Sequence, residues 1–174
     1  MDTVGDFLNW AWARHHNPLS WYIRPLFVLP FCYFAYRKSA WGLGLTVVAV
    51  ATSMFWFPAP AATDARAEAF LAMERQYVTG SWTFAKIAMT ALVPLWFVAL
   101  ASAFWWRSWL AGLLVINGGA LLKVIWSFYF AGTSAWSIIP AVGIGALIIN
   151  GVMLYAYRRV RRREASRPHR QPAG

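Results

Sequence analysis

Residues 14–24 read RHHNPLSWYIR, and this stretch lies where a mostly apolar chain begins. It combines arginines, histidines, a helix-start signal and aromatic side chains. Asn17 can cap a helix that has Pro18 in its first turn, because asparagine accepts hydrogen bonds from free helix N–H groups and proline needs no acceptor there. The stretch therefore predicts the junction between a surface segment and the first membrane helix.

The composition of the chain indicates a membrane protein. Of its 174 residues, 60% are hydrophobic and 13% are charged, whereas soluble domains carry roughly 25% charged residues. Aromatic residues make up 18%, and many lie at the ends of apolar runs, as in the aromatic belts at membrane interfaces. Because apolar runs occupy most of the chain, we expect one helical bundle without a separate soluble domain.

The apolar pattern predicts an all-α integral membrane protein: a bundle of five transmembrane helices plus two interfacial amphipathic helices on the outer side. The transmembrane helices are expected at about 19–36, 40–57, 82–106, 109–131 and 135–157, and the interfacial helices at about 4–16 and 63–79. Residues 1–157 then form a single transmembrane domain. Pro25 and Pro30 predict a kink in the first span, because proline donates no helical hydrogen bond. Cys32 is the single cysteine, so no intramolecular disulfide can form.

The net charge of +10 is unevenly distributed, which predicts an orientation. With five spans, one side of the membrane receives Arg37, Lys38, Arg107 and the arginines that follow residue 157. The other side receives five of the six acidic residues. The positive-inside rule makes the first side cytoplasmic, which predicts a multi-pass protein of the bacterial inner (plasma) membrane with its N-terminus outside.

Residues 158–174 are expected to form a basic, disordered cytoplasmic tail. A basic segment beside a membrane helix binds anionic lipid. Nucleic-acid binding would require a folded basic face, so membrane lipids are the expected partners and nucleic acid is not.

Several charged residues are predicted to lie near the outer face. Arg24, Lys86 and Lys123 fall about four to eight residues inside their spans, which at 1.5 Å per residue is ~6–12 Å below the interface. Glu74 lies on the apolar stripe of the 63–79 helix, so it faces the bundle. We therefore expect a ligand-binding cluster drawn from Arg24, Lys86, Lys123, Glu74, Glu68, His15, His16 and Asn17.

Each of these charges also has a structural interpretation. Lys86 and Arg24 can extend to the interface, and Lys123 can pair with Glu74 or with Glu68 to fasten the outer helix to the bundle. If several cations instead face one carboxylate, the excess positive charge favours an anionic headgroup or a small anion. Adjacent histidines point about 100° apart on a helix, and no Cys or third His lies on the outer side, so we expect neither a metal site nor a cofactor.

Three motifs resemble those of a family of small prokaryotic polytopic membrane proteins of unassigned function. They are H-x-N-P-x-S-x-x-x-R at 15–24, F-P-x-P at 57–60 and F-L-x-x-E-R at 70–75. In that family the first motif precedes the first span, and the second leads to an amphipathic helix with a Glu-Arg pair. The likeness covers roughly residues 10–160. The likeness implies a polytopic membrane fold but no activity. Because the segment at 15–24 and the segment from F-P-x-P to the Glu-Arg pair both fall on the outer side, they are candidates for one shared site.

The sequence leaves three functions open. The first is a small inner-membrane transport or accessory protein that binds an anionic group or a lipid headgroup in an outer-leaflet polar pocket. The second is a membrane-embedded enzyme that acts on a lipid with His15 or His16 and Glu74 as acid–base groups. The third is a structural or partner-binding subunit, alone or as a homo-oligomer. The chain has no phosphate loop, HExxH or Ser/His/Asp pattern, so no catalytic residue is assigned and an enzyme is not the expected class.

Overall fold

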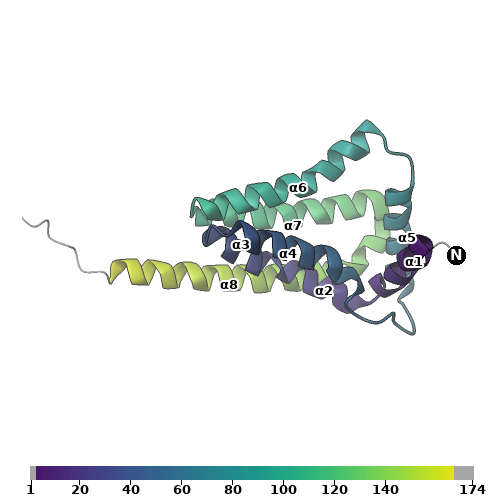
Figure 1. Cartoon of the computed structure of the whole chain (residues 1–174), viewed down its shortest axis with the longest axis horizontal. Helices are drawn as coiled ribbons and strands as arrows, with labels where there is room; N and C mark the ends of the chain where they lie inside the picture. Colours follow the sequence, from purple (N-terminus) through teal and green to yellow (C-terminus); the bar gives the residue numbers. More distant parts are fainter. Residues whose placement is uncertain (1–2, 167–174) are drawn as a thin grey trace, which may run out of the picture.

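The computed structural model describes residues 3–166, and these are helical and free of β-strand (Figure 1). The predicted all-helical class is confirmed. The elements are α1 (Thr3–His15), α2 (Pro18–Leu26), α3 (Val28–Tyr36), α4 (Ala40–Thr52), η1 (Ser53–Phe55), α5 (Ala65–Thr79), α6 (Phe84–Trp105), α7 (Trp109–Ala131), η2 (Gly132–Ser137) and α8 (Ile139–Ala165).

Three helical segments within residues 3–166 are long and apolar enough to cross a membrane. They are α6, α7 continued by η2, and α8. The segment Ala40–Phe55, which joins α4 to η1, is apolar but shorter. The predicted class of membrane protein with transmembrane helices is thus supported by three long apolar helices.

The first predicted span is divided into two helices of nine residues each, α2 and α3, which meet at Phe27. Pro30 accounts for the division, because its ring opposes the carbonyl of Leu26 four residues earlier and it has no N–H to donate. Pro25 lies inside α2 and removes one more helical hydrogen bond. The predicted kink is therefore present as a break between helices.

The last helix differs most from its predicted range of 135–157. Gly132 ends α7 with a positive φ of 51°, a conformation that favours glycine, and it begins η2, which runs to Ser137. α8 then runs from Ile139 to Ala165. The prediction of a disordered tail is wrong for residues 158–165: arginine is a good helix former, and basic side chains in the last turn are stabilised by the helix dipole. Arg167, His169 and Arg170 lie outside the described residues.

The longer helices share one core, to which α3, α6, α7 and α8 contribute. Its buried side chains include Phe31, Leu100, Phe104, Ile116 and Ile149. Glycine allows close contact at two of these crossings: a Cβ on Gly112 would lie 2.5 Å from the Phe104 ring, and one on Gly119 would lie 2.1 Å from Trp96 Nε1. Small residues at such positions let membrane helices approach closely.

The two ends of the molecule differ (Figure 1). α2–α3, α4, α6, α7 and α8 run along the long axis, and α1 and α5 lie together across one end of them. The short connections at 37–39 and 106–108 and the basic end of α8 lie toward the opposite end. α5 packs against η2 and α7, and α1 packs against η1. We call α1 and α5 the cap helices.

Candidate polar cluster beneath the cap helices

Local sequence signals position the cap helices and the start of α2. Asp64 caps α5, and its Oδ1 accepts hydrogen bonds from the backbone N–H groups of Arg66 and Ala67. Asn17 caps α2 by accepting from the N–H of Leu19, as the sequence predicts, and its Nδ2 also donates to the carbonyl of Pro58. Both caps have the side chain that satisfies free N–H groups at a helix start.

Glu74 of α5 connects three helices through its two carboxylate oxygens. Its Oε1 accepts a hydrogen bond from Lys123 Nζ of α7 at 3.3 Å. Its Oε2 lies 3.6 Å from His15 Nε2 of α1. The carboxylate therefore ties both cap helices to the long bundle, and Lys123 pairs with Glu74, not with Glu68.

Arg24 of α2 extends this cluster to a fourth helix. Its Nη2 lies 3.1 Å from His15 Nδ1, and its Nε donates to Ser53 Oγ at 3.3 Å. Guanidinium groups only donate hydrogen bonds, so His15 Nδ1 accepts and the proton of the neutral ring lies on Nε2, facing Glu74. We call Arg24, His15, Glu74 and Lys123 the polar cluster.

Burial and charge set the ionisation of the two cap-helix members. Burial lowers the pKa of His15, and the positive charge of Arg24 lowers it further, against the opposing hydrogen bond to Glu74. Burial alone would raise the pKa of Glu74, but the hydrogen bond from His15 and the charge of Lys123 outweigh it, so this pKa lies below its usual value. The cluster then holds two cations, one carboxylate and a neutral imidazole, which leaves one positive charge uncompensated.

The members of the cluster differ in their access to the surroundings. The His15 side chain is 7% exposed and that of Glu74 is 24% exposed, whereas that of Lys123 is 44% exposed. Lys123 Nζ also lies 4.6 Å from the centre of the Trp126 ring and 5.4 Å from that of Phe70. Such aromatic faces attract a cation without neutralising it. Lys123 is therefore the member best able to meet an external group.

Four predicted site residues lie outside the cluster. Lys86 Nζ donates to the carbonyls of Gly80 and Ser81 and lies over the rings of Tyr77 and Trp82, so it stabilises the connection before α6. Glu68 is exposed in the first turn of α5. His16 follows α1 directly, and its Nδ1 contacts the carbonyl of Trp12 in that helix. Asn17 is the α2 cap and links it to residue 58.

Three partners of the cluster were not predicted. Ser53 accepts from Arg24, Trp21 Nε1 donates to the carbonyl of His15 at 3.1 Å, and Trp126 lies beside Lys123. The only signal for Ser53 was a hydroxyl near the outer end of an apolar run. Nothing in its local pattern links it to a residue 29 positions away.

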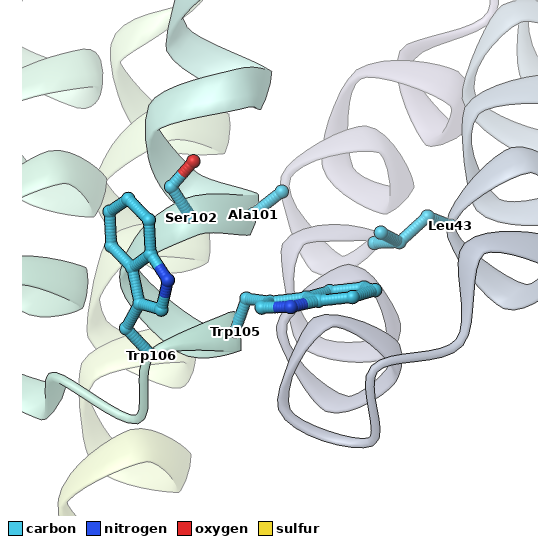
Figure 2. Close-up of a pocket in the computed structure, with 5 residues that line it drawn as sticks. All are labelled: Leu43, Ala101, Ser102, Trp105 and Trp106. Carbon is cyan, nitrogen blue, oxygen red and sulfur yellow. The ribbon is translucent and has the colours of Figure 1, made fainter.

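Two clefts in the described part of the chain lie away from the polar cluster. One, of about 370 Å³, lies near the end of α6 and is lined by Leu43, Ala101, Ser102, Trp105 and Trp106. Figure 2 shows the Trp105 ring directed toward Leu43, with Trp106 beside Ser102. The other is lined by Tyr155, Ser166 and four arginines of α8. The first is a mainly apolar surface and the second a basic one, and neither includes a member of the cluster.

Among residues 3–166, no three Cys, His, Asp or Glu side chains come together as a metal site requires. No family model, curated protein or solved structure matches this chain.

Proposed function

We propose that this chain is a five-span inner-membrane protein with its N-terminus outside and its C-terminus in the cytoplasm. The two nine-residue helices α2 and α3 together make the first span, and α4 with η1 makes the second. The alternating directions of the long segments in Figure 1 support this topology. So does the charge distribution, because the α3–α4 and α6–α7 connections and the basic end of α8 lie at the end remote from the cap helices. These connections hold Arg37, Lys38 and Arg107. The cap helices then rest at the outer interface.

Within this topology, we propose that the polar cluster binds an anionic lipid headgroup, and that the protein acts as a small transport or accessory subunit. The observation that supports this is the charge of the cluster. Arg24 and Lys123 are both cationic, and the one carboxylate between them, Glu74, shares its oxygens between Lys123 and His15. The cluster keeps a net charge of one positive unit, and Lys123, whose side chain is 44% exposed, is the cation that an external group can reach. The cluster lies within ~6–12 Å of the outer interface, where the long side chains of Arg24 and Lys123 can extend toward lipid phosphates, and uncompensated charge there attracts anionic headgroups.

The basic end of α8 is proposed as a second contact with anionic lipid, in the inner leaflet. Arg158, Arg159, Arg162 and Arg163 line one shallow cleft there with Tyr155. Each basic residue near an anionic membrane surface adds about 1 kcal/mol of attraction. This contact is less selective than the cluster, because exposed arginines on one helix meet any anionic surface.

The proposed headgroup site is tested by native mass spectrometry of the full chain with lipid extraction. Wild type is compared with Lys123→Met, Glu74→Gln and Lys86→Met. We expect an anionic lipid bound to wild type and to Lys86→Met, lost from Lys123→Met, and retained or increased in Glu74→Gln. Lys86→Met is the matched control, because Lys86 is a cation of the same end of the molecule whose ammonium bonds to backbone carbonyls.

A second candidate function is purely structural, and a specific observation favours it. Both oxygens of Glu74 face protein groups, and neither described cleft reaches the cluster. In this case the cluster only locks the cap helices, and the function lies in contacts with other proteins. The same experiment separates the two: no bound lipid in wild type, with lower stability in Lys123→Met and Glu74→Gln, would favour the lock and reject the headgroup site.

An enzyme that uses His15 is less well supported than either alternative. Both ring nitrogens already face protein groups, Arg24 on one side and Glu74 on the other. A general base needs a free nitrogen within reach of the substrate proton. His16 is half-buried, and its Nδ1 contacts the carbonyl of Trp12.

A further inference from the structure

Two asparagines form a polar pair on the outside of the long helices. Asn117 Nδ2 donates to Asn150 Oδ1 at 2.9 Å, and Asn150 Nδ2 donates back to Asn117 Oδ1 at 3.0 Å. Asn117 lies about 12 Å along α7 from Trp109, and Asn150 about 16 Å along α8 from Ile139. Both positions are close to the middle of a hydrocarbon core of roughly 30 Å. Asn117 is nevertheless exposed, so an amide pair faces lipid at the depth where polar groups are least favourable.

The same spacing of side chains surrounds the pair on both helices. On α7 the exposed stripe is Leu110, Leu114, Asn117 and Leu121. On α8 the stripe is Gly143, Leu147, Asn150 and Leu154, of which Asn150 is half-buried and the others are exposed. Each follows steps of four, three and four residues, which keeps its members on one helix face. Because the two asparagines bond to each other, the stripes adjoin and form one surface. We call it the α7–α8 surface.

The relief of this surface alternates between projecting leucines and open space. Leu114 is 67% exposed and Leu147 is 77% exposed. Beside them, a Cβ added to Gly118, Gly143 or Gly151 would meet no atom within 4 Å. Large side chains next to glycines allow a second pair of helices to pack closely in a membrane, because its leucines can fill the space above the glycines.

The hydrogen bonds of the pair leave it able to accept a partner. The second amide proton of Asn117 goes to the carbonyl of Leu113, and that of Asn150 to the carbonyl of Ala146. Each of these carbonyls lies four residues back in a helix, where it also accepts a backbone N–H. The carbonyls therefore do not depend on the amides, so a rotation of either side chain can exchange its bond to the carbonyl for one to a partner, and each Oδ1 retains a free lone pair.

We infer that the α7–α8 surface is the interface with a second copy of this chain. A second copy in the same orientation brings its own Asn117–Asn150 pair to the same depth, so amide meets amide across a twofold axis along the membrane normal. It also sets projecting leucines over open glycines, because both copies carry the same relief. The inference rests on α7 and α8 crossing the membrane and is independent of the proposed headgroup site.

The test is disulfide cross-linking of the full chain in native membranes. Cys32 is first replaced by alanine, so that each variant carries one cysteine. Leu147→Cys on the α7–α8 surface is compared with Val98→Cys on α6, where Val98 is 61% exposed. We expect a product of twice the chain mass from Leu147→Cys, at least tenfold more than from Val98→Cys.

A second measurement removes the amides while keeping the Leu147→Cys reporter. The double variant Asn117→Leu/Asn150→Leu replaces both partners with residues of similar size, so that no unpaired polar group is left behind. We expect the dimer product to fall at least fivefold. Equal cross-linking from both cysteine positions, a product with a different protein, or an undiminished product in the double variant would each overturn the inference.

Discussion

Arg24 Nη2 lies 3.1 Å from His15 Nδ1, and this contact determines which nitrogen of His15 carries the proton. A guanidinium donates and cannot accept, so a protonated imidazole would place two N–H groups against each other. The contact therefore stabilises neutral His15 with its proton on Nε2, directed toward Glu74. Nitrogen NMR of histidine-labelled protein should show this tautomer for His15 at pH 7, and a resonance of the Nδ1–H tautomer would contradict the assignment.

The stability of the protein should fall as the pH drops below about 6.5, the ordinary pKa of histidine. The pKa of His15 is lowered in the fold, so the unfolded chain binds a proton that the native state resists. Stability is then complete above about pH 7 and decreases as the pH falls toward the lowered value. Melting temperatures of detergent-purified protein between pH 8 and 5 measure this.

His15→Gln should flatten that pH dependence, whereas His16→Gln should preserve it, because His16 contacts neither Arg24 nor Glu74. Glu74 adds a further loss at lower pH. Its pKa is also lowered, so its contribution to stability is complete above about 4.5, the value it has when unpaired, and disappears as the carboxylate is protonated below that. If the melting temperature of His15→Gln fell with pH as steeply as that of wild type, other groups would be responsible for the loss of stability just below pH 7.

Glu74→Gln should destabilise the protein by about 2 kcal/mol, because it removes the charge that both His15 and Lys123 face. The control is Glu68→Gln, at an exposed position on the same helix, with an expected change within about 0.5 kcal/mol. Proteolysis between residues 56 and 64 gives a second readout, since detachment of α5 should let this already exposed connection move and enter a protease more readily. Equal stability of the two variants would mean that the cluster does not hold the cap.

Gly119 and Gly118 provide a matched pair for the packing of α7. Gly119→Ala should be destabilising by about 1–3 kcal/mol, because its Cβ would overlap Trp96, whose Nε1 donates to the carbonyl of Val115 at 2.8 Å. In the single chain, Gly118→Ala introduces the same atom into open space, so in detergent-purified monomer it should be neutral or slightly stabilising. The measurement is the melting temperature of each variant, which should be lower for Gly119→Ala than for Gly118→Ala. Equal melting temperatures would contradict the α6–α7 packing.

The proposed orientation predicts opposite labelling of the two ends. With Cys32 replaced by alanine, a cysteine at Ala61 should react with a membrane-impermeant maleimide added from outside. A cysteine at Ser39, between α3 and α4, should react only after the membrane is opened. The reverse pattern would invert the topology, and labelling of both from outside would exclude a span through α4.

Local signals in the sequence determined the helical class, the ends of several helices and the charge difference between the two ends. Asn17 caps the helix it was predicted to cap, because a cap acts over two or three residues. The apolar runs predict α6 and α7 to within two residues at each end, since hydrophobicity and length decide a long membrane helix. Pro25 and Pro30 predicted a disturbance near Phe27 for the same local reason.

Only the tertiary structure decided which charges meet. Depth along the membrane normal can be estimated from residue counts, and it placed Arg24, Lys86, Lys123 and Glu74 at similar levels. Depth says nothing of position around the bundle, which depends on close contacts such as Gly119 with Trp96. Packing therefore paired Lys123 with Glu74 over Glu68, left Lys86 with backbone carbonyls and joined Asn117 to Asn150.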